Sequence, residues 1–260
     1  MNDLNYPDFI TLVQIVSDGD GPSLFKETEI PFHNIHAHGA ETEVFPAKEV
    51  AFVWTPADFA KGFHTASRRR LILVLDGQME IEVGQGDHKV FGTGDMIDIL
   101  DTTGEGHKTR VVGGLDMHTA LIEIGEKIRP DWTLLEDAQQ RTGPLTRTMA
   151  GRDGASHFVD DTLSYCYNAP LGKATAALPL VGYQFVFKPG SLYHGFHNAP
   201  QKQFVLNLTS GMQVETSDGA TRDIHPGNIF LGEDTTGEGH KTRAINARSR
   251  LSIFAHLLDR

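Results

Sequence analysis

The chain has 260 residues and a formal net charge of −11 at pH 7. This acidic balance disfavours a nucleic-acid-binding protein, because such proteins neutralise phosphates with clustered Lys and Arg. The single cysteine, Cys166, excludes an intrachain disulfide. We see neither a signal-like start nor a run of about 18 apolar residues, so we expect a cytoplasmic protein with no membrane partner.

A long-period repeat organises the chain. Residues 101–110 (DTTGEGHKTR) recur unchanged at residues 234–243, a shift of 234 − 101 = 133 residues. The two halves stay in register without gaps over about residues 12 to 110, so that Pro46 aligns with Pro179 and Pro56 with Pro189. Such self-similarity indicates two copies of one structural unit. We therefore predict an N-terminal domain of residues 1–133 and a C-terminal domain of residues 134–260.

Short apolar runs separated by turn residues dominate both halves. They cover residues 71–75, 79–83, 89–91 and 96–100, and then 204–208, 212–215 and 229–231. Strands of about five residues at this spacing are typical of an all-β sandwich or barrel. Gly94 and Gly227 stand in turns that call for a positive φ. Between the halves, residues 131–140 carry the best helical signal, in a stretch short enough to be a linker.

Two motifs in each half resemble those of the cupin superfamily. The first comprises Gly62, His64, Arg70 and Gly77 in one half, and Gly195, His197, Gln203 and Gly211 in the other. The second is a glycine turn followed by His107 or His240, twelve residues after Asp95 or Asn228. The chain thus resembles a bicupin of a subgroup with a Thr-Thr-Gly-x-Gly-His sequence. The resemblance implies an all-β fold with two tandem double-stranded β-helix (cupin, jelly-roll) barrels.

The resemblance also bears on metal binding. Metal-binding cupins present two histidines and a glutamate from the first motif and a histidine from the second, a set that suits Fe, Mn, Ni or Zn. Arg70 stands at the glutamate position of the N-terminal barrel and has no lone pair to donate, so we expect no metal there. In the C-terminal barrel one divalent ion is an open alternative. Its candidate ligands are His194, His197 and His240. Gln203 stands at the glutamate position and is a candidate ligand-binding residue.

The repeated loop, a His-x-His sequence and a run of arginines are three further candidate features. Thr102 and Thr103 are candidate ligand-binding residues at a barrel mouth, although the repeated loop can equally be structural, with Asp101 capping a turn and its two glycines at positive φ. His36 and His38 form a His-x-His sequence that we expect in a loop outside the main strands. The run of arginines at residues 68–70 is expected to be a solvated strand end.

Three functions remain open at this point. The first is binding of a small, carboxylate-bearing organic molecule by His64, Arg70 and His107, because arginine can hold both oxygens of a carboxylate. The second is a metal-dependent enzyme of the dioxygenase or decarboxylase type in the C-terminal barrel. The third is a structural or storage bicupin with filled barrels. His107 and His240 are the candidate catalytic residues of any enzyme, and we expect a homo-oligomer.

Overall fold

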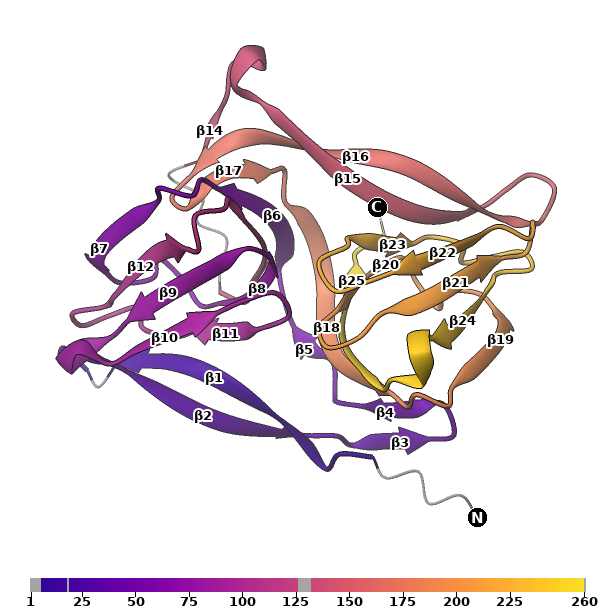
Figure 1. The fold of residues 1–260 in the computed structure, drawn as a ribbon, viewed down its shortest axis with the longest axis horizontal. Coiled ribbons are helices and arrows are strands. Elements are labelled where there is room, and N and C mark those ends of the chain that lie inside the picture. Colours follow the sequence, from indigo (N-terminus) through magenta and orange to yellow (C-terminus); the bar gives the residue numbers. More distant parts are fainter. Residues whose placement is uncertain (1–5, 18, 126–131, 260) are drawn as a thin grey trace.

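The computed structural model describes residues 6–17, 19–125 and 132–259, which form two β barrels side by side (Figure 1). These residues contain three short 3-10 turns, η1 (Gly84–Gly86), η2 (Asp137–Gln139) and η3 (Ile245–Ala247), and no α-helix. No helix in this part of the chain is therefore long and apolar enough to cross a membrane. The predicted fold class, all-β with two jelly-roll barrels, is confirmed.

The strands of the first half are β1 (Phe9–Ser17), β2 (Ser23–Pro31), β3 (Asn34–His36), β4 (Gly39–Glu41), β5 (Phe45–Pro46), β6 (Glu49–Thr55), β7 (Ala60–His64), β8 (Arg70–Asp76), β9 (Gln78–Glu82), β10 (His88–Phe91), β11 (Met96–Ile99), β12 (His107–Val112) and β13 (Met117–Glu123). Then follow β14 (Thr133–Leu134), β15 (Arg141–Ala150), β16 (Ser156–Ala169), β17 (Gly172–Thr175), β18 (Leu178–Lys188), β19 (Tyr193–His197), β20 (Gln203–Asn207), β21 (Met212–Thr216), β22 (Thr221–Ile224), β23 (Phe230–Gly232), β24 (His240–Ala244) and β25 (Arg250–Leu257).

The two barrels repeat one strand order. The N-terminal barrel pairs β2-β1-β11-β8-β13-β6 on one side and β10-β9-β12-β7 on the other. The C-terminal barrel pairs β16-β15-β23-β20-β25-β18 and β22-β21-β24-β19. The strands therefore follow the 133-residue repeat. The predicted domain boundary falls within β14 and stays a prediction.

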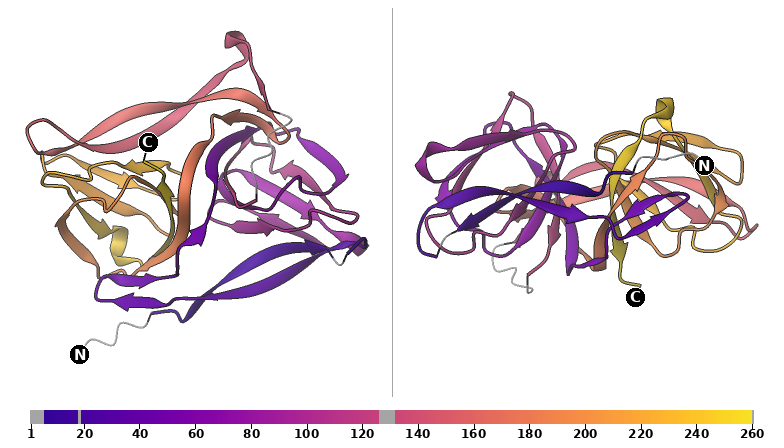
Figure 2. Two further views of the ribbon diagram at one scale, coloured as in Figure 1. Left: turned by 180° about the vertical axis from the view of Figure 1, so that it is seen from behind. Right: turned by 90° about the horizontal axis from the view of Figure 1, so that it is seen from below.

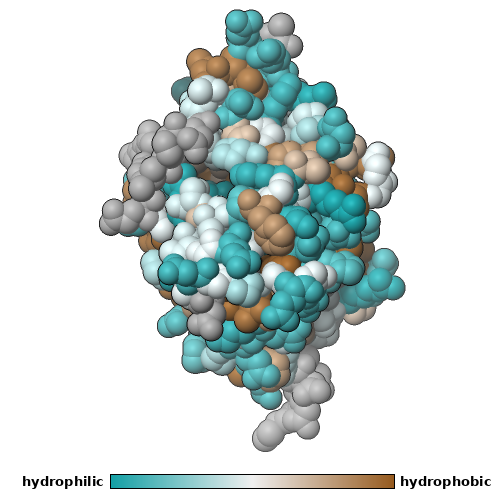
Figure 3. Space-filling model, turned by 90° about the vertical axis from the view of Figure 1, so that its left-hand side faces the viewer, coloured by the Kyte–Doolittle hydropathy of each residue, from teal (hydrophilic) through white to brown (hydrophobic). Residues whose placement is uncertain are grey.

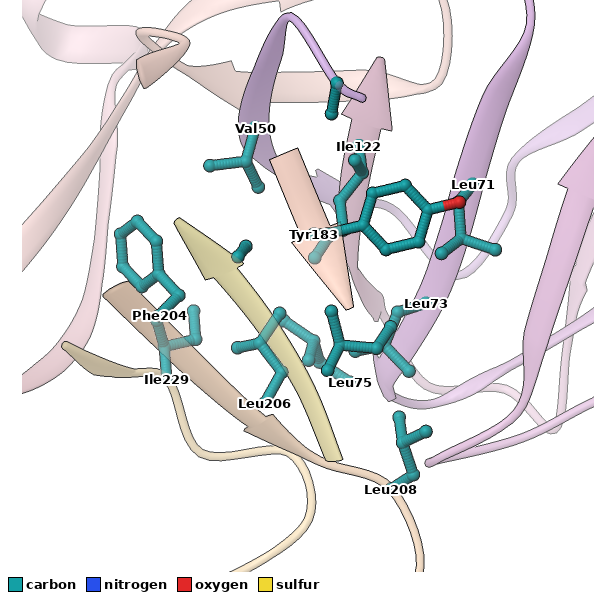
Figure 4. Packing of buried hydrophobic residues seen from close by; sticks show 14 of the residues in the cluster. Val50, Leu71, Leu73, Leu75, Ile122, Tyr183, Phe204, Leu206, Leu208 and Ile229 are labelled. Atoms are coloured by element: carbon teal, nitrogen blue, oxygen red, sulfur yellow. The ribbon is translucent and has the colours of Figure 1, made fainter. Parts of the chain in front are cut away.

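The inner strands of the two barrels are covered on both faces. In β8, Leu71, Leu73 and Leu75 belong to a core between the barrels, while Ile72 and Val74 point into the N-terminal barrel. A strand that is buried on both faces has a continuous apolar sequence, which is why residues 71–75 show no alternation of polar and apolar residues. Figure 4 shows the shared core, with Leu206 and Phe204 of β20 gathered with side chains of the first half.

Strands cross between the halves in a reciprocal manner. On β18, Leu178 pairs with Val50 of β6, and Tyr183 pairs with Phe45 of β5. The repeat relates the two pairs to each other, because Leu178 is the counterpart of Phe45 (178 − 133 = 45) and Tyr183 is the counterpart of Val50 (183 − 133 = 50). Likewise β4 pairs with β18, and β17 with β6. Figures 1 and 2 show the consequence: β3 and β4 lie beside the C-terminal barrel, and β17 lies beside the N-terminal one.

Two turn glycines lie at the contact between the barrels. Gly94 and Gly227 have φ values of +90° and +89°, as predicted for these turns. A Cβ on Gly94 would lie 2.1 Å from the Leu208 carbonyl oxygen, and one on Gly227 would lie 2.6 Å from that of Leu75. No side chain fits at such distances, so glycine allows each turn to pack against the backbone of the other barrel.

The helical expectation for residues 131–140 is wrong over the residues that are described. Residue 131 lies outside them, and the remainder forms β14 and η2. Thr133 and Leu134 pair with Asn168 and Tyr167 of β16, so pairing with a neighbouring strand decides the local conformation.

The apolar residues gather inside. The end of the molecule formed by the N-terminal barrel presents a mostly hydrophilic and neutral surface, on which the hydrophobic areas are small and separated (Figure 3). Each barrel also contains a cavity.

Candidate functional site

The N-terminal barrel encloses a cavity of about 320 Å³. Its floor is apolar and includes Ile72, Met79, Ile81, Ile99 and Met117. Its polar lining includes Lys61, His64, Arg70 and His107, with no carboxylate among the described lining residues. Three of the predicted ligand-binding or catalytic residues, His64, Arg70 and His107, therefore come together in one place.

Both histidines of this cavity are oriented through Nδ1. His107 Nδ1 lies 2.7 Å from Asp101 Oδ2, and Asp101 is fully buried. His64 Nδ1 lies 2.8 Å from the Gly62 carbonyl oxygen. Because a carboxylate and a carbonyl oxygen can only accept, each Nδ1 carries a proton, and in the neutral ring the free lone pair is on Nε2. Burial lowers the pKa of His64, which favours this neutral form.

The part of the repeated segment that precedes β12, residues 101–106, holds His107 in place. Gly104 and Gly106 have positive φ as expected, and a Cβ on Gly106 would lie 2.1 Å from the His64 carbonyl oxygen. Thr102 and Thr103 are exposed and are not among the residues that line the cavity, so their role as ligand contacts stays a prediction. Thr103 instead donates a hydrogen bond to the Gly19 carbonyl oxygen, over 3.2 Å.

The arginine run is a buried charge cluster rather than a solvated strand end. Arg68 is 8% exposed, and its Nε lies 3.1 Å from Glu123 Oε2. Arg70 Nε lies 3.6 Å from the same oxygen, and Arg70 Nη2 donates to Ser67 Oγ over 3.1 Å. Of the three arginines only Arg69 is exposed. Arg70 therefore shares its carboxylate partner with a second arginine.

The C-terminal barrel holds a second cavity, of about 260 Å³. His197 and His240 are arranged as in the first barrel: Nδ1 of His197 lies 2.7 Å from the Gly195 carbonyl oxygen, and Nδ1 of His240 lies 2.6 Å from Asp234 Oδ2. Gln203 and His194 also line this cavity, so the predicted residues of this barrel are brought together.

A column of imidazole rings forms one wall of the second cavity. His194 stacks on His197 with ring centroids 3.7 Å apart, and His38 stacks on the other side of His194 at 4.7 Å. Burial, followed by the neighbouring His197, lowers the pKa of His194 to about 4, so this ring is neutral at pH 7. His36 and His38 come from the first half: His38 lies in the turn between β3 and β4, as expected for a loop, whereas His36 ends β3, and both line this cavity. Only the exchange of strands reveals this placement, and the local sequence carries no signal for it.

The cations of the second cavity occupy different positions from those of the first. At the position of Arg70 stands Gln203, opposite His256 on β25, where the first barrel has Glu123 opposite Arg70. Arg250 lines the cavity at the position of Met117. The Arg70–Glu123 pair is thus replaced by two polar groups without formal charge, and the cation moves to another strand.

The residues present do not fit the divalent ion that the cupin resemblance suggests. In the first cavity Arg70 occupies the carboxylate position. In the second, His194 and His197 are stacked with ring centroids 3.7 Å and ring planes 16° apart, so their lone pairs lie in two separate, nearly parallel planes and do not converge on one ion. Lys188 and Arg250 line the same cavity. Among the residues that the structure describes, no group of three His, Cys, Asp or Glu side chains is placed to hold a metal.

Comparisons with known proteins reveal only distant likenesses. No family model matches the sequence, and no curated protein matches it. A cupin 2 conserved barrel domain protein from Leptotrichia buccalis is similar over 87% of this chain and 92% of its own, with 10% identity and a TM-score of 0.41. Salicylate 1,2-dioxygenase from Pseudoaminobacter salicylatoxidans is similar over 81% and 72%, with 11% identity and a TM-score of 0.37. Oxalate decarboxylase from Bacillus subtilis is similar over 88% and 76%, with 11% identity and a TM-score of 0.32.

At such low TM-scores and identities these likenesses carry no argument about family or activity. The architecture of paired barrels rests on the strand pairings, and the chemistry of the site rests on the residues that line the two cavities.

Proposed function

We propose that the protein is a diverged tandem cupin that binds a small organic molecule bearing a carboxylate inside its N-terminal barrel. The observation that carries the proposal is the cavity of about 320 Å³ whose described charged lining residues, histidines aside, are Lys61 and Arg70. Its apolar floor suits the carbon skeleton of an organic acid, and a cationic end suits its carboxylate.

His64 and His107 supply the remaining polar contacts. With Nδ1 engaged, Nε2 of His64 and of His107 can each accept a hydrogen bond from a hydroxyl or amine of the ligand. Thr119 also lines the cavity, and its buried Oγ1 has no partner among the described residues. The best ligand is therefore a carboxylate that carries hydroxyl or amino groups. The alternative of a storage protein with filled barrels is disfavoured, because each barrel contains a cavity.

Calorimetry with a panel of small organic acids tests the proposal. Arg70→Gln introduces the residue that the second half carries, and we expect it to weaken the best acid by about 10- to 100-fold, since a hydrogen bond to a charged group contributes about 1.5–3 kcal/mol. Arg70→Lys keeps the charge beside Glu123 but loses the planar fork, so an intermediate loss is expected.

Arg110→Gln is the matched control, because Arg110 is an exposed arginine of β12 paired with Glu80. Unchanged affinity for every acid in Arg70→Gln, with the protein still folded, would contradict the proposal.

A second candidate function is proton transfer on the bound molecule. The observation that favours it is the buried Asp101 that holds His107 in one tautomer with Nε2 toward the cavity, which is how a general base is oriented. Exchange of a carbon-bound proton of a bound acid with deuterated solvent, followed by NMR, would test it. Exchange that persists unchanged in His107→Gln would exclude His107 as the base.

A further inference from the structure

The C-terminal barrel contains a buried guanidinium with no partner. Arg250 is 3% exposed, and within the described residues its side chain makes no hydrogen bond or ion pair; its buried Nε is without an acceptor. Burial lowers its pKa to about 10. Since a buried, uncompensated charge is costly, such a group calls for an anion that the protein itself does not provide.

The residue opposite Arg250 in the sheet is a second cation rather than a counterion. Arg250 of β25 pairs with Lys188 of β18, and like charges directly opposite each other destabilise a sheet. Lys188 lies 3.5 Å from Glu41, the one carboxylate among the described residues that line the cavity. Glu41 also lies 3.3 Å from His36 Nε2. Histidines aside, the cavity is therefore lined by two cations and one anion, and Arg250 is the cation left over.

Two further polar atoms of the same cavity lack partners. Gln203 Oε1 and His256 Nδ1 are buried and make no hydrogen bond in the described structure. The two residues lie opposite each other on β20 and β25. Phe230 and Phe254 add apolar surface to the lining. The cavity thus combines one unpaired cation, two unsatisfied hydrogen-bonding groups and apolar walls.

We propose that this cavity is a second, separate binding site for a small organic carboxylate, with Arg250 holding the carboxylate and with Gln203 and His256 bonding a polar group of the same molecule. The site goes beyond the function proposed for the N-terminal barrel, because its cation is absent there: the counterpart of Arg250 is Met117, and that of Lys188 is Thr55. It is completed by His36, His38 and Glu41 of the first half.

The test uses the full chain and the variant Arg250→Met, which introduces the counterpart residue. In calorimetry and thermal unfolding with a panel of organic acids, and with inorganic phosphate as a separate arm, wild type should bind an organic acid that raises its melting temperature. Arg250→Met should weaken the affinity for that acid at least tenfold and abolish the rise in melting temperature that the acid causes. Without any acid, Arg250→Met should melt higher than wild type, because the unpaired buried charge is gone.

Arg70→Gln should leave this second acid's affinity unchanged, so failure at one site is distinguishable from failure at the other. Gln203→Leu, which keeps Arg250, should weaken the binding of the same acid. That loss would confirm that Gln203 contacts the polar group of the ligand. The proposal is overturned if Arg250→Met retains every affinity, or if phosphate alone binds and no organic acid competes with it.

Discussion

At the scale of single residues, the repeat conceals a difference in hydrogen bonding. Asp234 accepts bonds from Thr148, Ser156 and His240, so both of its oxygens are engaged. Asp101 accepts from Ser23 and His107 through Oδ2, and its buried Oδ1 has no partner among the described residues. The reason is the counterpart of Thr148, which is Ile15. Burial opposes ionisation of Asp234, but the bonds from His240, Ser156 and Thr148 outweigh it and lower its pKa.

This difference predicts unequal costs for one substitution. Asp234→Asn should lower the free energy of unfolding by about 3 kcal/mol and Asp101→Asn by about 2 kcal/mol, because an amide nitrogen cannot accept the bonds that a carboxylate oxygen accepts. Urea unfolding measures both, with the exposed Asp87→Asn as control. Equal costs would show that the Thr148 contact contributes nothing.

At the scale of elements, each of the seven apolar runs of the sequence overlaps a strand, and both turn glycines have the expected positive φ. The shift aligns residues that occupy equivalent places, so His64 with His107 and His197 with His240 meet in the same way. What it does not predict is contact between non-equivalent segments. His38 reaches the C-terminal cavity because β4 pairs with β18, and the local sequence around residue 38 contains no trace of that partner. The sequence did not predict a role for Arg250 either, because the burial of its side chain without a partner arises only in the folded barrel.

The imidazole column joins the turn between β3 and β4 to β19, and it predicts a pH dependence. The pKa of His194 falls from 6.5 to about 4 on folding. Above pH 6.5 the ring is neutral in both states. Between pH 6.5 and about 4 the unfolded chain binds the proton and the folded protein does not, so stability declines as the pH falls. The melting temperature should therefore drop over this window.

His194→Phe keeps a stacked ring without a titrating group, so a smaller drop is expected for it than for wild type. His88→Phe, an exposed substitution on β10, should leave the drop unchanged. Identical pH profiles for wild type and His194→Phe would remove the column as the cause.

At the scale of the whole molecule, the two barrels share one core and exchange strands, so we expect them to unfold together. Leu73→Ala and its counterpart Leu206→Ala both empty positions that are at most 1% exposed in this core. Each should cost about 2–5 kcal/mol. Differential scanning calorimetry should show one transition that moves as a unit in both variants. Two separate transitions, of which only one moves, would show that the barrels are independent.

The reciprocal contacts of Gly94 with Leu208 and of Gly227 with Leu75 have a further consequence. A surface that meets its own copy, so that residue i contacts j and j contacts i, is the mark of an isologous interface in a two-fold symmetric dimer. A single-barrel ancestor would make these same contacts with a second copy of itself, and fusion of two genes would preserve them within one chain. In such a dimer every substitution occurs twice. After fusion it occurs once, so one barrel can carry Arg70 and Met117 where the other carries Gln203 and Arg250, while the interface between the barrels keeps the old symmetry.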